Sequence, residues 1–201
     1  MQLASNDSDK LERYRAKRDF GKSSEPEGAG GPRGRGSVFV IQKHDATSLH
    51  YDFRLEVDGV LKSWAVPKGP STDPREKRLA IRTEDHPLDY AEFEGVIPEG
   101  EYGAGSVLIW DRGTYRNITE KDDGLRAMED ALADGHVLVW LDGEKISGGY
   151  ALQRIDDEKD QWLLIKMDDA EADARRNPVS TEPRSVASGR DLDEISGEEG
   201  E

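Results

Sequence analysis

Residues 37–66, SVFVIQKHDATSLHYDFRLEVDGVLKSWAV, decide the fold class of this chain. Three runs within it, 37–44, 49–57 and 60–66, are rich in β-branched and aromatic residues and read as strands. Asp58 and Gly59 separate the second run from the third, and Asp-Gly between two such runs is the strongest short signal for a tight hairpin turn. The segment therefore predicts consecutive antiparallel strands.

Short strand-like runs continue along the next hundred residues. They lie at 78–83, 106–110, 136–141, 149–155 and 161–167, with Gly, Pro and Asp at nearly every boundary. Only Asp122–Asp134 has a clear helical composition, so the alternation of strands and helices that marks a parallel α/β sheet is missing. We predict a mostly β fold: a compact antiparallel β-barrel with a few short helices and flexible N- and C-terminal segments, its core built around four tryptophans.

The two ends differ in composition from the strand-rich middle. Residues 8–20 have helix-forming composition, and 23–36 is rich in Gly, Pro, Ser and charge, which is typical of a mobile connector. Beyond Asp169 the chain is too polar to offset its ordering entropy, and we expect a largely disordered tail. The expected organisation is an N-terminal helix and flexible segment (1–36), one barrel domain (37–169) and an acidic tail (170–201).

Composition limits the classes of function. The 201 residues include no cysteine, which excludes disulfides and thiolate metal sites. No apolar leader and no membrane-spanning window occur, so we expect a cytoplasmic protein without membrane contact. The net charge of −15 argues against a nucleic-acid partner, but residues 1–119 carry 20 acids and 18 bases, against 23 and 10 in 120–201. The acidity lies mainly outside the motif-bearing region, where solubility is its simplest explanation.

One face of the run 49–57 carries chemically active side chains. Successive strand residues point to opposite sides, so His50, Asp52, Arg54 and Glu56 share one face, while Tyr51, Phe53, Leu55 and Val57 share the other. An ordinary solvated face would also alternate in this way. The grouping of an imidazole, a carboxylate and a guanidinium instead favours a metal beside an anion.

The run 37–44 adds to the same face. Gln42 and His44 project together there, and His44 can meet His50 across adjacent strands. Two imidazoles and one carboxylate suit Mn²⁺, Zn²⁺ or Fe²⁺ and leave coordination positions open. We predict that His44, His50 and Asp52 bind a divalent metal.

Basic residues near this set point to an anionic substrate. They are Arg54, Lys68, Arg78 and Arg82, with Tyr90 close by, and arginine grips phosphate through paired hydrogen bonds. His86, before Pro87, could donate to phosphate or protonate a leaving oxygen. His136 is interpreted as structural, and the glycine-rich stretch 95–105 as a hairpin or barrel corner, because no helix follows it.

Several motifs together resemble one known family. QKHDATSLHYDFRLE (42–56), WAVPKGPS (64–71), RLAIRTEDHPLDYAEFEG (78–95) and IPEGEYGAGSVLIWDRGTY (97–115) closely resemble the 3′-phosphoesterase module of bacterial DNA ligase D and its stand-alone relatives. YRAKRDF (14–20), Glu25-Pro26 and EPRSVASGR (182–190) extend the resemblance along most of the chain. Because ligase and polymerase modules are missing here, the chain resembles the stand-alone form.

The resemblance implies an activity and a cofactor. It implies a β-barrel enzyme of break repair, including non-homologous end joining, that removes a 3′-terminal ribonucleoside and then the 3′-phosphate of a primer strand. The implied cofactor is Mn²⁺, with Zn²⁺, Co²⁺ or another divalent metal as alternatives. The implied partners are nucleic-acid 3′ ends, and separate ligase, polymerase or Ku-type repair proteins; we expect a monomer.

The resemblance also implies site residues, carried over by position. The metal ligands fall on His44, His50 and Asp52, and the phosphate contacts on Arg54, His86 and Tyr90. Further residues needed for activity fall on Gln42, Lys68, Arg78 and Glu84 in the barrel and on Arg18, Asp19 and Glu25 in the N-terminal segment.

Two other functions remain open at this point. A non-catalytic nucleic-acid or partner-binding module would use the polar strand face for docking, although the intact His, His, Asp and Arg set disfavours it. A nucleotidyl transferase fragment is suggested by KHDA (43–46), which resembles a K-x-D-G nucleophile motif, but Ala46 replaces the required glycine.

Overall fold

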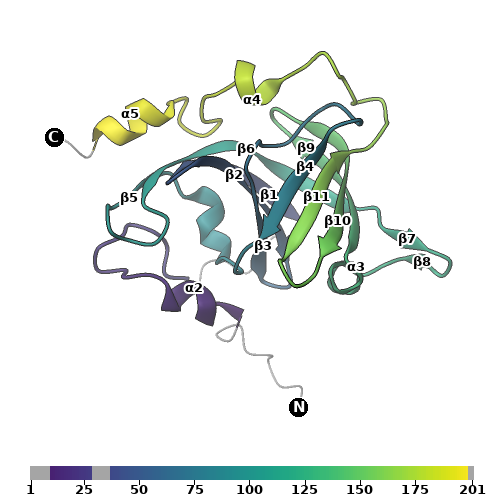
Figure 1. The fold of residues 1–201 in the computed structure, drawn as a ribbon, viewed down its shortest axis with the longest axis horizontal. Helices are drawn as coiled ribbons and strands as arrows, with labels where there is room; N and C mark the ends of the chain where they lie inside the picture. The colour runs from purple at the N-terminus through teal and green to yellow at the C-terminus, as the bar shows by residue number, and fades with distance from the viewer. Residues whose placement is uncertain (1–9, 29–36, 199–201) are drawn as a thin grey trace.

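The computed structural model describes residues 10–28 and 37–198, which form a closed antiparallel β-barrel with short helices at its ends and outer face (Figure 1). The strands are β1 (Val38–Asp45), β2 (Leu49–Val57), β3 (Val60–Val66), β4 (Lys77–Arg82), β5 (Gly95–Ile97), β6 (Gly105–Asn117), β9 (His136–Gly143), β10 (Ser147–Asp156) and β11 (Gln161–Lys166). Their order is β1-β2-β3-β4-β11-β10-β9-β6-β5, and pairing of β1 with β6 closes eight of them into the barrel. The predicted fold class is confirmed.

The Asp58-Gly59 turn forms as the sequence indicates. Both residues have positive φ, 49° and 80°, and Val57 pairs with Val60 across a two-residue loop. This backbone matches the twist of the flanking strands, which is why such turns prefer Asp-Gly. β2 and β3 therefore leave the turn in the register that sets their two faces.

Close approach of β1 and β6 depends on a glycine. Gly105 has φ of +139°, and a Cβ there would lie 1.9 Å from the carbonyl oxygen of Asp45. Only a residue without a side chain allows this contact. Gly105 thus permits the strand pairing that closes the barrel beside the candidate site.

Two separate apolar clusters hold the chain together. The first fills the barrel and includes Trp64, Trp110 and Trp162, all with at most 2% of their surface exposed. Trp140 is only half-buried, because Val139 and Leu141 take the inward positions of β9. One of the four predicted core tryptophans therefore lies on the outer face.

The second cluster lies outside the barrel and covers part of its outer face. Its members are Tyr14, Leu61, Tyr90, Phe93, Ile97 and Val107, with Phe20, Leu88 and Ala91 packed against them. They come from β3, β5, β6, the N-terminal segment with α2 (Glu12–Ala16), and the 3₁₀-helix η1 (Leu88–Glu92) with Phe93 beyond it. This outer cluster fixes the N-terminal segment against the sheet.

The helical interval and the N-terminal connector differ from their predictions. Residues 120–125 form a small hairpin, β7 (Glu120–Lys121) and β8 (Gly124–Leu125), and only Met128–Asp134 forms a helix, α3. Gly124 has φ of +106°, which breaks the expected helix early. Ser23 and Glu25, expected in a mobile connector, are buried against the barrel, while 29–36 lies outside the described residues.

The tail also differs from its prediction over 170–198. It contains α4 (Pro178–Thr181) and α5 (Leu192–Gly197), and Ile195 is 2% exposed. Val186 N donates to Ile109 O over 2.9 Å, and Trp110 Nε1 donates to Glu182 O over 2.8 Å. These tertiary contacts offset the ordering entropy that the polar composition alone could not.

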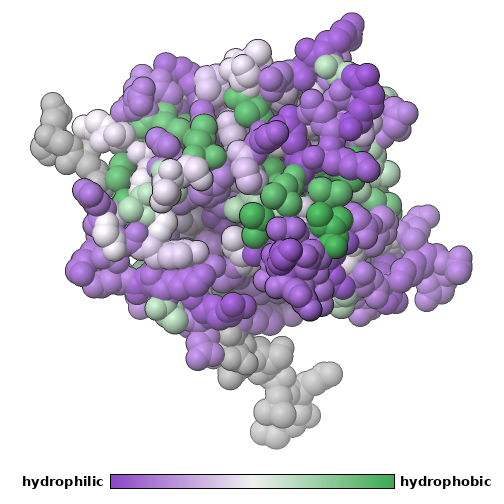
Figure 2. Space-filling model, in the orientation of Figure 1, coloured by the Kyte–Doolittle hydropathy of each residue, from purple (hydrophilic) through white to green (hydrophobic). Residues whose placement is uncertain are grey.

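The face of the molecule seen in Figure 2 is mostly polar, as expected for a barrel whose apolar side chains point inward. Figure 2 shows a face dominated by hydrophilic side chains, with small apolar patches between them. Within 10–28 and 37–198, no helix is long and apolar enough to cross a membrane.

Candidate metal centre

The candidate metal ligands lie on the outward faces of two paired strands. β1 and β2 run antiparallel, and their register places His44 opposite His50 and Gln42 opposite Asp52. The two imidazole rings have centroids 4.8 Å apart. The strands thus bring His44 and His50 together as the alternation pattern indicates.

The three side chains are close enough to share one ion. One ligand atom from each of His44, His50 and Asp52 lies within 4.8 Å of the others. Asp52 Oδ2 is 3.4 Å from His44 Nδ1 and 3.4 Å from His50 Nε2. A nitrogen-nitrogen-oxygen set of this kind suits a divalent transition metal and leaves positions open for substrate.

Backbone carbonyls fix the tautomer of each histidine. His44 Nε2 lies 2.6 Å from Gly103 O, and His50 Nδ1 lies 3.0 Å from Ser48 O. Because a carbonyl oxygen only accepts, each of these ring nitrogens must carry the proton. The opposite nitrogens of the neutral rings then present lone pairs to the Asp52 carboxylate, an arrangement that a cation between them would stabilise and that metal-binding histidines commonly show.

Asp52 is held in its ionised form. Burial would raise its pKa, but the Arg54 guanidinium and the adjacent imidazoles of His44 and His50 outweigh burial and keep the pKa well below its usual value. For His50, burial lowers the pKa, but the contact with Asp52 dominates and leaves it raised. A buried anion flanked by two imidazoles is therefore the electrostatic centre of this site.

Arg54 lies next to the candidate metal ligands, and one of its guanidinium nitrogens has no hydrogen-bond partner among the described residues. Its Nε donates to Gln42 Oε1 over 2.7 Å, and its Nη2 is 3.5 Å from Asp52 Oδ2. Its Cζ lies 4.9 Å from the centre of the Tyr90 ring. Among the described residues, its buried Nη1 has no hydrogen-bond partner. A buried guanidinium with a free N–H beside a cation site is suited to bind an anion.

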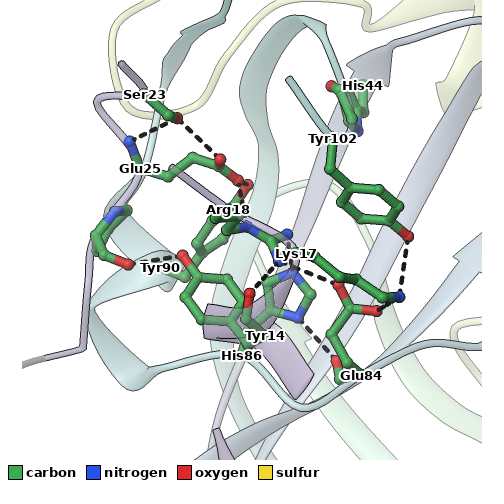
Figure 3. Close-up of polar contacts among 12 residues, drawn as sticks. Tyr14, Lys17, Arg18, Ser23, Glu25, His44, Glu84, His86, Tyr90 and Tyr102 are labelled. Atoms are coloured by element: carbon green, nitrogen blue, oxygen red, sulfur yellow. Dashed lines mark hydrogen bonds and ion pairs between the residues drawn. The ribbon is translucent and has the colours of Figure 1, made fainter. Parts of the chain in front are cut away.

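The N-terminal segment supplies a second arginine to the same region (Figure 3). Arg18 Nε is 3.0 Å from Glu25 Oε1, and its Nη1 is 3.2 Å from Glu84 Oε1. Its Nη2 is 3.4 Å from His86 Nε2, and its guanidinium lies 3.9 Å from the Tyr14 ring centre. Arg18 thus links the N-terminal segment to the β4–η1 connection.

His86 is neutral in this arrangement. Burial, together with the charges of Arg54 and Arg18, holds its pKa well below the usual range. Its Nδ1 donates to Glu84 O over 2.9 Å, so Nε2 accepts from Arg18. Backbone hydrogen bonds to Leu61, of 2.8 and 3.0 Å, fix its position.

Tyr90 is also held in its protonated form. Burial raises its pKa well above the usual value, and its hydroxyl donates to Glu25 Oε1 over 2.9 Å. Glu25 also accepts from Ser23 Oγ over 2.9 Å. The tyrosine ring is therefore anchored by the N-terminal segment while it packs on Arg54.

The structure gathers most, but not all, of the residues expected in the site. Those joined by these contacts are Arg18, Glu25, Gln42, His44, His50, Asp52, Arg54, Glu84, His86 and Tyr90. Asp19 is exposed and accepts from Gly21 N in a local turn. Arg78 pairs with Glu76 and donates to Lys68 O, so neither Lys68 nor Arg78 contacts the metal set.

Sequence reasoning missed other members of the site. Lys17 Nζ lies 3.0 Å from Glu84 Oε2 and 3.4 Å from the Tyr102 hydroxyl. Gly103 contributes only a carbonyl, which residue type cannot reveal. The glycine-rich stretch is the predicted hairpin, in which β5 pairs with β6, yet its loop also orients His44.

Fold and site together define a class: a small antiparallel β-barrel that carries a candidate divalent-metal site on its outer face, beside a buried arginine with an unpaired nitrogen. Comparison with known proteins agrees. The model of the DNA ligase D 3′-phosphoesterase domain family matches residues 42–154. The chain belongs to the DNA ligase D 3′-phosphoesterase domain family.

Similar proteins include much longer chains. A multifunctional non-homologous end joining protein LigD of Pseudomonas aeruginosa is 48% identical over 188 residues, covering 90% of this chain and 22% of the relative. A multifunctional non-homologous end joining DNA repair protein LigD of Mycobacterium tuberculosis is 54% identical over 160 residues, covering 79% of this chain and 20% of the relative. The chain thus spans about a fifth of the length of these curated relatives.

Proposed function

We propose that this chain is a divalent-metal-dependent phosphoesterase that processes the 3′ ends of nucleic-acid strands in DNA break repair. Its substrates would be primer strands ending in a ribonucleoside or a 3′-phosphate. The observation that carries the proposal is the unpaired, buried Nη1 of Arg54 beside the His44, His50 and Asp52 cluster. A phosphate with one oxygen on Arg54 and another near the cluster would satisfy both.

The residues present fit a divalent metal. Two imidazole nitrogens and one carboxylate oxygen converge, and the carbonyl contacts of both rings leave the converging nitrogens free to coordinate. Mn²⁺ is our proposed cofactor, in line with the family resemblance. When bound, such an ion would polarise a phosphoryl oxygen as a Lewis acid.

The chain's own residues would bind and orient the phosphate and protonate the departing oxygen. Arg54 would neutralise charge on the phosphate, while Gln42 holds its guanidinium through Nε and leaves Nη1 without a protein partner. Tyr90 would shield this contact from water by covering the guanidinium. An arriving phosphate would offset the Arg54 and Arg18 charges that lower the His86 pKa, so that His86 could gain a proton and donate it to the departing oxygen.

The remaining predicted residues have supporting places in this proposal. Arg18, Glu25 and Glu84 would hold His86 and Tyr90 in position through the contacts already described. Lys68 and Arg78 would act only on parts of the strand away from the scissile phosphate. Asp19 would act through the turn that returns the chain towards Ser23.

The nucleotidyl transferase alternative loses support from the strand geometry. Lys43, its required nucleophile, lies between Gln42 and His44 in β1 and therefore points to the opposite side of the sheet from both. A lysine on that side cannot attack a phosphate held at Arg54. We therefore do not propose adenylate or guanylate transfer.

The test is hydrolysis of a labelled primer-template that ends in one 3′-ribonucleotide. We expect shortening and then formation of a 3′-OH end in Mn²⁺, loss of both in His44→Ala, and no change in His136→Ala. His136 is the matched control because it is exposed and its Nδ1 contacts Gln153 Oε1, at 2.6 Å, away from the candidate metal ligands.

Two outcomes would contradict the proposal. Full metal-dependent turnover by His44→Ala would show that the cluster is not the centre of the reaction. Strand binding without product under any divalent metal would instead favour the non-catalytic binding module. Size-exclusion chromatography and pull-down with ligase, polymerase or Ku-type proteins would test the expected monomer and partners.

A further inference from the structure

Tyr102 exposes an aromatic ring next to the candidate metal centre. Its exposed fraction is 48%, and it is the only aromatic among the large exposed apolar side chains of residues 10–28 and 37–198. It lies in the loop between β5 and β6, between His44 and Lys17 in Figure 3. A ring exposed at this place is available to a ligand that reaches the candidate metal centre.

The position of the ring is fixed relative to the metal ligands. The next residue, Gly103, accepts the hydrogen bond of His44 Nε2 at 2.6 Å, which ties the backbone beside Tyr102 to a candidate metal ligand. Lys17 Nζ lies 4.6 Å from the ring centre and Arg18 Cζ lies 5.4 Å from it. The tyrosine is therefore a partly exposed π surface that already packs against two cations.

A polar groove opens beside this ring. Its volume is about 430 Å³, and its lining includes Lys10, Arg13, Lys17, Arg82, Glu84 and Tyr102. This volume lies in the range of pockets that hold small ligands. Arg13 is exposed and has no ion pair among the described residues, which leaves its charge available to phosphate.

The chemistry of ring and groove favours a nucleotide over a peptide or a membrane. Single-stranded nucleic acids bind where cations follow the backbone and aromatic rings stack on bases. Walls that are mainly polar would not hold apolar side chains or acyl chains. Glu84 joins the two sites, since it contacts Lys17 in the groove and Arg18 beside His86.

We propose that Tyr102 stacks on the base of the nucleotide on the 5′ side of the processed phosphate, and that the groove holds the backbone of this nucleotide along Lys17 and Arg13. This inference deepens the proposed function and rests on it. It predicts that activity depends on the presence of a base on the nucleotide 5′ of the processed phosphate. The identity of this base should matter little, because every base offers a π face.

The test combines a change in the protein with a change in the strand. Steady-state kcat and KM are measured in Mn²⁺ on a 3′-ribonucleotide primer-template, and on the same duplex with an abasic residue on the 5′ side of the processed phosphate. The variants are Tyr102→Ala, Tyr102→Phe and the control Leu125→Ala, whose side chain is 64% exposed on β8. Fluorescence anisotropy of the same strands measures binding without turnover.

We expect that loss of the Tyr102 ring raises KM and leaves kcat nearly unchanged. Tyr102→Ala should raise KM on the intact strand roughly tenfold, and Tyr102→Phe should restore it because the ring remains. On wild type, the abasic strand should show a similar rise, and Tyr102→Ala should add little to it. Leu125→Ala should behave as wild type.

Other outcomes separate this inference from the proposed function. If wild type hydrolyses the strands and Tyr102→Ala shows the same ratio of intact to abasic KM as wild type, stacking is refuted while the phosphoesterase stands. If no hydrolysis occurs, the phosphoesterase fails, and anisotropy decides the inference alone. Equal binding of intact and abasic strands would then overturn it.

Discussion

Gln42 offers the sharpest test of how the proposed anion site is built, through the substitution Gln42→Leu. The side chain has no exposed surface, and its amide joins three groups. Its Nε2 donates to Tyr90 O over 2.8 Å and to Phe93 O over 3.1 Å, and its Oε1 accepts from Arg54 Nε over 2.7 Å. Leucine has similar volume but can make none of these bonds.

The expected loss of stability follows from the buried polar groups that lose their hydrogen bonds to Gln42. Each buried polar group that loses its partner costs about 1–3 kcal/mol, and a charged one lies at the upper end. Three such groups, with partial relaxation of η1, give a loss of roughly 4 kcal/mol in the free energy of unfolding. Because domains of this kind are stable by about 5–15 kcal/mol, the variant should fold but remain marginal.

Urea unfolding followed by tryptophan fluorescence measures this loss, since Trp64, Trp110 and Trp162 lie in the barrel core. The control is Gln153→Leu, because Gln153 is half-buried and accepts from the exposed His136; it should cost less than about 0.5 kcal/mol. Turnover of Gln42→Leu, measured under folding conditions, should fall at least 10-fold as Arg54 loses its orientation. A stability loss below about 1 kcal/mol with normal turnover would refute this account of the site.

Three further predictions concern neighbouring residues. Burial and two arginines keep His86 neutral in the folded state, so the unfolded chain binds more protons than the folded one below about pH 6.5. As the pH falls below this value, the free energy of unfolding of wild type should decrease by about 1.4 kcal/mol per pH unit relative to that of His86→Phe, and above pH 7 the two slopes should agree. Urea titrations at several pH values measure this difference. Arg18→Met removes the cation paired with Glu25 and should lower stability by about 3 kcal/mol and speed proteolysis of the N-terminal segment, whereas the exposed Arg13→Met should not. Gly105→Ala places a Cβ 1.9 Å from Asp45 O and should lower stability by about 3 kcal/mol and weaken Mn²⁺ binding, measured by calorimetry; wild-type metal affinity would contradict the role given to this strand contact.

Local patterns predicted the parts of the site that depend on one or two neighbouring strands. Alternation along residues 49–57 placed His50, Asp52 and Arg54 on one face, and the strand order brought His44 beside them. Turn chemistry at Asp58-Gly59 gave the correct register. These features depend on residue types only a few positions apart, so they can be predicted from the sequence.

Features set by distant contacts could not be read in this way. The polar tail is ordered because Ile195 and Val186 reach the barrel, and Trp140 faces outward because its neighbours in β9 fill the core. Lys17 and Tyr102 join the site only through the folded N-terminal segment and the β5–β6 loop. Each of these depends on a tertiary partner that local composition does not specify.

Burial across the site is graded, and this gradient bears on which phosphates the site can accept. The His50 side chain is 19% exposed, those of His44 and Asp52 are 9% exposed, and that of Arg54 is 3% exposed. Although Arg54 points away from the barrel core, the Tyr90 ring of η1 packs on it and its Nη1 is buried, so a phosphate must pass this cover to reach Nη1. A strand interior, with chain on both sides of the phosphate, would have to pass through that cover, whereas a strand end enters from one side. The depth of Arg54 therefore supports end processing over internal cleavage, and truncation of Tyr90, which packs on Arg54, should raise activity on internal phosphodiesters relative to ends.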